Sequence, residues 1–133
     1  MEFNNNTPIY LQIIESIKQD IVVGKLTVGQ KMPSVREFAA ILKVNPNTVQ
    51  RVYQELDREK VTFTKRGMGT YVTNEKHIIE LLKEEILKKI VHDFLEGMNK
   101  LGFSDEKVIG TLKENLYKEG KYNGTDFKNQ STQ

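Results

Sequence analysis

The sequence lacks cysteine altogether and has no long uninterrupted apolar segment. Without cysteine, neither a disulfide scaffold nor a thiolate metal site can form, and this composition is typical of a reducing compartment. No apolar stretch approaches the roughly 18 residues that a membrane-spanning helix needs. The N-terminal residues show no apolar core of a signal peptide. We therefore expect a cytoplasmic protein that does not enter a membrane.

Catalytic and metal-binding residues are also scarce. The chain has two histidines, and no Ser/His/Asp set, Cys/His set or carboxylate pair stands out against apolar surroundings. His92 and Glu96 lie one helical turn apart and could share a metal ion, but a complete site needs more such ligands than the sequence offers. The sequence thus predicts a protein that is not an enzyme and that has no metal and no cofactor.

Charge is unevenly distributed along the chain, although the net charge is only +2. Residues 1–74 hold ten Lys and Arg against seven Asp and Glu, whereas residues 75–133 hold ten against eleven. A basic excess in the N-terminal half, mild as it is, is the kind that a nucleic-acid-binding region needs.

Residues 44–56 are predicted to form a helix with two unlike faces. Apolar residues at three-and-four spacing make one face, namely Val49, Val52, Tyr53 and Leu56. The other face is polar but poor in Glu and Lys, and it presents Asn47, Gln50, Arg51 and Gln54. Amides, hydroxyls and arginines hydrogen-bond base edges and phosphates in a major groove. Asn45 suits the N-cap and Pro46 the first helical position, so the start of this helix is sharply specified.

Two further helices are predicted before this one. Thr7 and Pro8 indicate the start of a first helix, with a hydroxyl cap and then a proline, and Gly24 its end. Ser34 and Glu37 match a capping box at the start of a second helix. Between these helices a short strand could include Leu26, Val28 and Met32. Two capped helices joined by a tight turn, the second rich in amides, are typical of a helix-turn-helix.

A β-hairpin is predicted directly after the helix-turn-helix. Residues 61–64 and 70–73 are rich in β-forming residue types and flank a glycine-containing turn. Gly67 permits a positive φ and a close approach to a phosphate or sugar. Lys65 and Arg66 place two cations at the tip. A hairpin in this position is the wing of a winged helix.

Two helices and a tail are predicted for the C-terminal part. In the long helix over residues 75–101, the apolar side turns roughly half way round from Leu87 onward, and a helix with two apolar sectors has two partners. A shorter helix is capped by Ser104 and ends at Gly120, and it covers only part of the second sector. The residues expected on its inward face are Val108, Ile109, Leu112 and Leu116. A homodimer is therefore expected, formed by Leu87, Ile90, Val91, Phe94, Leu95 and Met98.

Together these elements predict a mainly α fold with a small β-hairpin. A winged helix-turn-helix DNA-binding domain is expected at residues 1–74, and a helical dimerisation domain at residues 75–120. The polar residues 121–133 are expected to be disordered.

Four motifs of the N-terminal half, in this order, resemble a known family. They are Pro8-Ile9-Tyr10-Leu11-Gln12-Ile13, Gly29-Gln30-Lys31-Met32-Pro33-Ser34-Val35-Arg36-Glu37, Val44-Asn45-Pro46-Asn47-Thr48-Val49 and Gly67-Met68-Gly69-Thr70-Tyr71-Val72. The combination is similar to the GntR family of bacterial transcription regulators, and the short tail is similar to that of its YtrA-like subfamily. The resemblance implies a homodimeric repressor that binds a palindromic operator in double-stranded DNA. The small tail leaves room for a small-molecule effector at the dimer interface, or for none.

The residues expected to contact DNA belong to the second helix, the recognition helix and the wing. They are Ser34, Arg36, Asn45, Asn47, Thr48, Gln50, Arg51, Lys65, Arg66 and Gly67. The resemblance implies this role for Arg36, for the start of the recognition helix and for the wing glycine. Arginine is unfavourable near a helix N-terminus, which favours a phosphate or base partner for Arg36. Arg51 and Arg58 could instead be solvated charges of the helix.

Three residues depart from the family pattern. Pro46 stands where many members carry a base-reading arginine, Lys60 replaces a common glycine, and Thr62 replaces a commonly apolar strand residue. A winged helix that binds protein instead of DNA would predict an apolar or acidic recognition face. The amides, hydroxyl and arginine of this face favour DNA.

Overall fold

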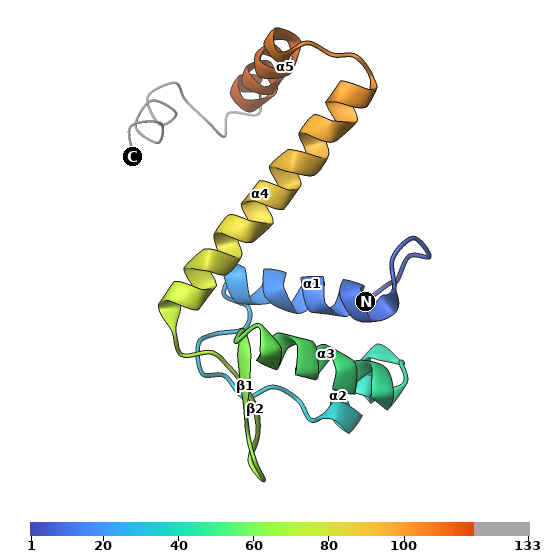
Figure 1. Cartoon of the computed structure of the whole chain (residues 1–133), viewed down its shortest axis with the longest axis vertical. Helices are drawn as coiled ribbons and strands as arrows, with labels where there is room; N and C mark the ends of the chain where they lie inside the picture. Colours follow the sequence, from blue (N-terminus) through green and yellow to red (C-terminus); the bar gives the residue numbers. More distant parts are fainter. Residues whose placement is uncertain (119–133) are drawn as a thin grey trace. The chain divides into compact units, whose positions relative to one another are not determined.

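The structure is a computed structural model that describes residues 1–118. The described residues form five helices and one two-stranded antiparallel sheet (Figure 1). They confirm the predicted fold class, a mainly α chain with a winged helix-turn-helix. The chain divides into two compact units, with the boundary after Leu87. The functional boundary expected after residue 74 stays a prediction, and the expected helix end at Gly120 and tail at residues 121–133 lie outside the described residues.

Helix α1, Ile9–Val22, begins one residue later than predicted. Pro8 has an extended ψ of 140° and occupies the N-cap position, where no side chain caps the helix, so the predicted Thr7 cap is wrong. The Gln12 side-chain amide instead donates to the Thr7 carbonyl oxygen at 2.7 Å. Gly24, with a φ of 82°, follows the helix end as predicted.

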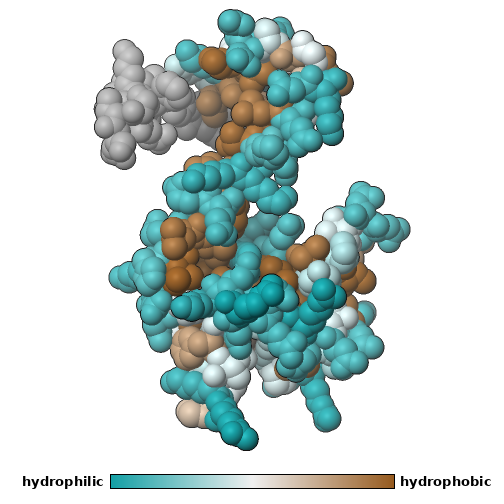
Figure 2. All heavy atoms as spheres, viewed as in Figure 1, coloured by the Kyte–Doolittle hydropathy of each residue, from teal (hydrophilic) through white to brown (hydrophobic). Residues whose placement is uncertain are grey.

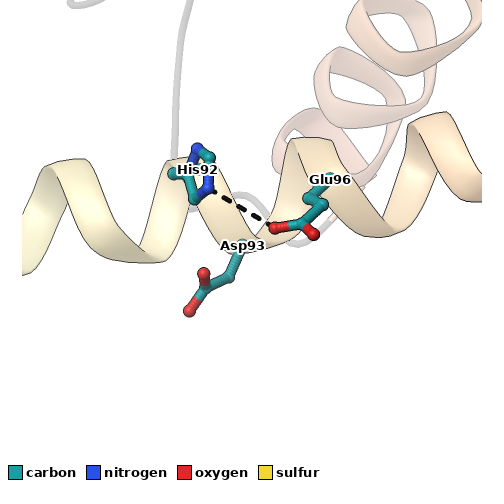
Figure 3. Close-up of side chains that lie close together, drawn as sticks. All are labelled: His92, Asp93 and Glu96. Carbon is teal, nitrogen blue, oxygen red and sulfur yellow. Dashed lines mark ion pairs between the residues drawn. The ribbon is translucent and has the colours of Figure 1, made fainter.

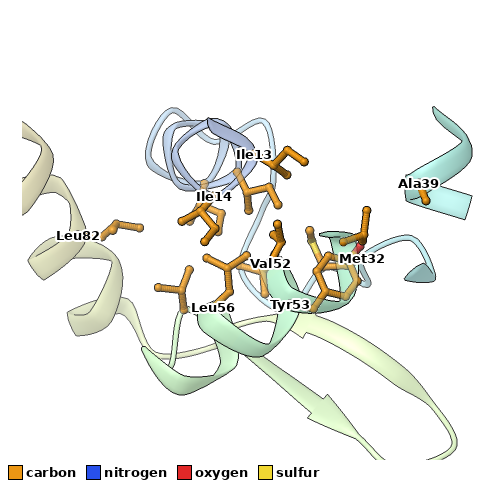
Figure 4. Packing of buried hydrophobic residues seen from close by; sticks show 13 residues of the cluster. Ile13, Ile14, Met32, Ala39, Val52, Tyr53, Leu56 and Leu82 are labelled. Carbon is orange, nitrogen blue, oxygen red and sulfur yellow. The ribbon is translucent and has the colours of Figure 1, made fainter. Parts of the chain in front are cut away.

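The core of the first unit lies between α1 and α3, Pro46–Arg58. Its fully buried residues on these helices are Ile13, Val49, Val52 and Leu56, each 0% exposed. Leu82 of α4 (Lys76–Lys100) joins the same cluster near Ile14 (Figure 4). Truncating a buried side chain of this kind to alanine costs about 2–5 kcal/mol of folding stability. Several such side chains on one face of α3 therefore hold the helix in one orientation against α1.

The predicted starts of the two helices of the helix-turn-helix are confirmed. In α2, Val35–Leu42, the Ser34 hydroxyl oxygen accepts a hydrogen bond from the Glu37 N–H at 3.1 Å. At the start of α3 the Asn45 side-chain oxygen accepts from the Asn47 N–H at 2.8 Å, and a proline takes the first helical position. These local bonds fix where α2 and α3 begin, and the bond of Asn45 also fixes where the turn of the helix-turn-helix ends.

The predicted hairpin is formed by β1, Thr62–Lys65, and β2, Gly69–Val72. Residues 29–32 pair with the other edge of β2 through backbone hydrogen bonds of 2.7–3.0 Å. The short strand that was expected to include Leu26 and Val28 is not formed by these residues. Its place is taken by a single β-bridge between Lys31 and Tyr71. The hairpin is therefore anchored to the loop that precedes α2.

Helix α4 matches the long helix predicted for the C-terminal part. In α5, Asp105–Lys118, the Ser104 hydroxyl oxygen accepts from the Lys107 N–H at 3.2 Å, as predicted. Val108 is buried. The other α5 residues predicted to face inward are exposed: Ile109 by 53%, Leu112 by 44% and Leu116 by 38%. That prediction is wrong for the single chain, because among residues 88–118 the end of α4 is the only helix beside α5. None of the described helices is long and apolar enough to cross a membrane.

Candidate nucleic-acid interface

The outward face of α3 carries the polar residues that follow its N-cap. Asn47, Gln50 and Arg51 are exposed and Thr48 is half-buried, whereas the opposite face is closed to solvent. Asn45 is also exposed, but its side-chain oxygen already accepts the capping bond. Its side-chain NH₂ is left to donate. The face thus offers amide, hydroxyl and guanidinium groups to a partner, the set that suits base edges and phosphates.

Ser34 and Arg36 lie at the start of α2, and both are exposed. The Tyr53 hydroxyl donates to the Pro33 carbonyl oxygen at 2.6 Å, which ties this helix start to α3. Burial, with a smaller contribution from the negative charge of Glu37, raises the pKa of Tyr53 well above its ordinary value. The hydroxyl therefore remains a donor at neutral pH, and the two helix starts are held together.

The predicted cations of the wing, Lys65 and Arg66, are exposed where β1 turns into β2. Figure 1 shows this hairpin extending away from the helices. Gly67 has a φ of 77°, and a Cβ there would meet nothing within 4 Å, so the turn requires glycine for its backbone conformation rather than for space. The Lys65 ammonium lies 5.6 Å from the centroid of the Phe63 ring and 5.3 Å from that of Tyr71. These two stacked rings hold the lysine stem along one face of the wing.

A carboxylate of α3 holds the first strand of the wing. The hydroxyls of Thr62 and Thr64 each donate to one oxygen of Asp57 at 2.5 Å. Thr64 also shares a hydrogen bond of 2.9 Å with Thr70 of β2. The network explains Thr62, which is 2% exposed where an apolar residue is common. One feature of the sequence could have indicated this network. An aspartate is unfavourable in the last turn of a helix, and here it is followed by two threonines at strand spacing that can donate to it.

The two arginines of α3 have different surroundings. Arg58 forms an ion pair with Glu55, one turn before it on the same helix. Arg51 instead stacks on an aromatic ring of α1, with its guanidinium carbon 3.6 Å from the centroid of Tyr10. The sequence shows Tyr10 only as part of the first family motif and does not predict this contact, since the two residues belong to different helices.

The residues predicted to form a dimer lie on α4 in two groups. Leu87, Ile90, Val91 and Leu95 are 43–61% exposed, and Figure 2 shows apolar atoms gathered over the end of α4 and α5. Phe94 and Met98 are half-buried and line a cavity of about 580 Å³ with residues of α5. Exposed apolar surface of this extent is unusual on a monomer that has no partner.

His92, Asp93 and Glu96 lie close together on the polar face of α4 (Figure 3). His92 Nε2 is 3.4 Å from a Glu96 carboxylate oxygen, while Lys89 and Lys100 pair with Asp93 and Glu96 respectively. All three residues are exposed, and two lysines compete with a cation for the carboxylates. The arrangement is that of a solvated helix face.

Known proteins resemble this chain over most of its length. Residues 9–72 match the family described as bacterial regulatory proteins, gntR family. The HTH-type transcriptional repressor YtrA of Bacillus subtilis is 39% identical over 111 residues, covering 83% of this chain and 85% of the relative. The uncharacterised HTH-type regulator YhcF of the same species is 38% identical over 112 residues, covering 84% and 93%. A solved GntR-family regulator from Listeria monocytogenes has a TM-score of 0.78 and 43% identity, covering 84% and 98%.

These similarities extend from the helix-turn-helix into the C-terminal helices, since the matched lengths exceed the family region. The relatives are regulators of transcription and not enzymes. The structural match to the Listeria regulator covers 84% of this chain, so it includes most of the winged helix-turn-helix and of the helices that follow it. The chain accordingly belongs to the GntR family of bacterial regulatory proteins, as a DNA-binding transcription regulator of the short YtrA-like kind.

Proposed function

We propose that this regulator is a cytoplasmic repressor that binds a palindromic operator as a homodimer. The observation that carries the proposal is the exposed polar face of α3, which combines amide, hydroxyl and guanidinium groups on a helix with a firmly packed back. The N-terminal residues of the second helix of a helix-turn-helix contact base edges. A relative that spans most of this chain is named a repressor.

The predicted contact residues other than Arg51 make two kinds of contact in this proposal. Asn47, Gln50 and the NH₂ of Asn45 read bases or contact phosphates at the start of α3, where Thr48 adds a hydroxyl. At the start of α2, Ser34 and Arg36 contact the DNA backbone, as the wing does through Lys65, Arg66 and the backbone at Gly67. Contacts to the DNA backbone contribute affinity without sequence preference.

The homodimer is proposed from the exposed apolar residues of α4. A second copy of the chain would cover Ile90, Val91 and Leu95, which are 61%, 45% and 43% exposed. Burying such side chains stabilises association at about 25 cal/mol for each Å² removed from water. A two-fold symmetric dimer presents two recognition helices, and its operator then mirrors that symmetry. The cavity lined by Phe94 and Met98 is the place where a small-molecule effector would bind beside this interface.

The deciding experiment is fluorescence anisotropy with DNA from the promoter of the protein's own gene and with a scrambled duplex, across a salt series. Tight promoter binding, weak scrambled binding and a steep fall with salt are expected, because phosphate contacts release counterions. Sedimentation of the same protein should report a dimer. Failure to bind either duplex at low salt would overturn the proposal and favour a winged helix that binds protein.

A further inference from the structure

Arg51 is held in place before any partner arrives. Its guanidinium carbon lies 3.6 Å from the centroid of the Tyr10 ring, the distance of a stacked cation–π contact. Tyr10 belongs to the first turn of α1 and Arg51 to the second turn of α3, so the contact bridges two helices. Within residues 1–118 no carboxylate forms an ion pair with Arg51, whereas Arg58 on the same helix is paired with Glu55. Arg51 thus keeps an uncompensated charge in a fixed place.

The surroundings of Arg51 suit an anionic oxygen. A shallow surface depression is lined by Tyr10, Arg51, Asn47, Thr48 and Ile9. The hydroxyl of Thr48 adds a neutral donor to the charge of the guanidinium. To read a guanine, an arginine must extend outward into the groove and present both nitrogens to one base edge. The stack on Tyr10 draws Arg51 sideways toward α1, to the edge of the recognition face.

We propose that Tyr10 is a positioning residue, which holds the Arg51 guanidinium as a sequence-independent phosphate contact at the edge of the recognition helix. The inference rests on the proposed DNA-binding function and adds a residue to it. A free arginine loses much rotamer freedom when it binds a phosphate. A stacked arginine has lost part of that freedom already, so more of its attraction to the phosphate appears as affinity. Tyr10 would strengthen DNA binding without touching DNA.

The test uses the full chain, the promoter and scrambled duplexes, and the same salt series. Arg51→Ala should weaken binding to both duplexes by about tenfold. It should also reduce the salt slope by the share of one phosphate in each subunit, about 0.9 per subunit and about 1.8 for the dimer. Tyr10→Leu should weaken both by about three- to tenfold, the range expected of an exposed to partly desolvated cation–π contact. Tyr10→Phe should bind like the wild type, and Tyr10→Leu with Arg51→Ala should bind no more weakly than Arg51→Ala alone.

Two controls keep the inference separate from folding and from the proposed function. Arg58→Ala, a matched arginine with an acidic partner, should leave binding unchanged. Arg51→Lys leaves α1 unchanged and keeps the positive charge. It should weaken binding as much as Tyr10→Leu does while the salt slope stays that of the wild type. This variant tests the loss of the stacked guanidinium if Tyr10→Leu does not fold.

Four outcomes would overturn the inference. In the first, the losses of affinity in Tyr10→Leu and Arg51→Ala multiply in the double variant, and in the second, Tyr10→Phe loses as much affinity as Tyr10→Leu. In the third, Arg51→Ala loses affinity for the promoter duplex alone. In the fourth, neither Tyr10→Leu nor Arg51→Lys changes binding. In each of these the wild type still binds DNA and the proposed function stands. A wild type that binds neither duplex overturns the function, and this inference with it.

Discussion

Asn47 stands in the first turn of α3 with its side chain exposed, while its N–H is used by the cap of the helix. Its amide has both a donor and an acceptor and can therefore pair with an adenine edge through two hydrogen bonds. The neighbouring Pro46 has no such group, so the choice of base at this end of the helix is expected to depend strongly on Asn47.

Replacing Asn47 by alanine should relax the base preference at one operator position. The expected loss is about 1–3 kcal/mol on the preferred sequence, and little on scrambled DNA, because one bidentate contact disappears. Anisotropy with operators substituted one position at a time measures this. Gln54→Ala, further along the same face, is the matched control and should cost less. An equal loss on operator and scrambled DNA would mean that Asn47 does not read a base.

Lys60 has a backbone that its residue type disfavours. Its φ is 64°, in the left-handed region. It follows the end of α3, where the Val61 N–H donates to the Leu56 carbonyl oxygen and the Lys60 N–H to that of Asp57, both at 3.0 Å. This is the helix ending in which glycine is usual. Having lysine instead of glycine at residue 60 therefore lowers the stability of the folded protein.

Lys60→Gly should stabilise the protein. Relief of the left-handed strain is worth roughly 1–2 kcal/mol, and the greater freedom of glycine in the unfolded chain removes about 0.5–1 kcal/mol, so a net gain of about 0.5–1 kcal/mol is expected. Urea unfolding measures it. Glu59→Gly, at a neighbouring residue with a φ of −81°, should destabilise instead. A loss of stability in Lys60→Gly would mean that its side chain contributes more than the strain costs.

Among the secondary-structure elements, the wing depends on α3 for its orientation. Asp57 accepts from Thr62 and Thr64, and Thr64 continues the network to β2 through Thr70. A two-stranded hairpin is marginally stable by itself. The carboxylate near the end of α3 thus helps to hold the wing beside the recognition helix, which sets the distance between the two proposed DNA contacts.

Asp57→Ala should destabilise the first unit by about 1–2 kcal/mol. Hydrogen bonds to a charged group contribute about 1.5–3 kcal/mol, and removing a carboxylate from a helix C-terminus returns about 0.3–1 kcal/mol. Much of the loss comes from the Thr62 hydroxyl, which is 2% exposed and would lose its acceptor. Adding Thr62→Val should therefore recover part of the stability. Denaturant unfolding decides this, and a double variant less stable than Asp57→Ala would contradict it.

For the whole molecule, the exposed apolar residues of α4 decide the proposed assembly. Ile90 is 61% exposed and Leu81, on the same helix in the first unit, is 59% exposed. Only Ile90 belongs to the sector predicted to meet a second copy. The two residues therefore offer a matched pair for a test of the dimer.

Ile90→Glu should convert the dimer to a monomer, because a carboxylate buried in an apolar interface is strongly unfavourable. Sedimentation should report half the mass. Affinity for a full palindrome should fall on the order of a hundredfold, since the two half-sites would no longer bind as one unit. Leu81→Glu should remain a dimer with unchanged operator affinity. A dimer that persists in Ile90→Glu would place the interface elsewhere.

Much of the fold could be predicted because it depends on short-range chemistry. The caps at Ser34, Asn45 and Ser104 form hydrogen bonds to residues two or three positions away, so neighbouring residues suffice to predict them. The hairpin follows from β-forming residues around Gly67. The polar face of α3 follows from helical spacing, and the predicted DNA contacts within it remain predictions. The early start expected for α1 was wrong by one residue, the usual uncertainty at helix ends.

The sequence by itself therefore determined the helices, the hairpin, the family and the composition of the recognition face, since each depends on residues close together in the chain. Only the tertiary structure decided which side chains of different helices and strands meet. It brought Tyr10 under Arg51, and it left Ile109 on the surface because no further helix within residues 1–118 covers it. The physical reason is that packing joins residues from different helices, and the orientation of one helix against another depends on the whole core rather than on any local pattern.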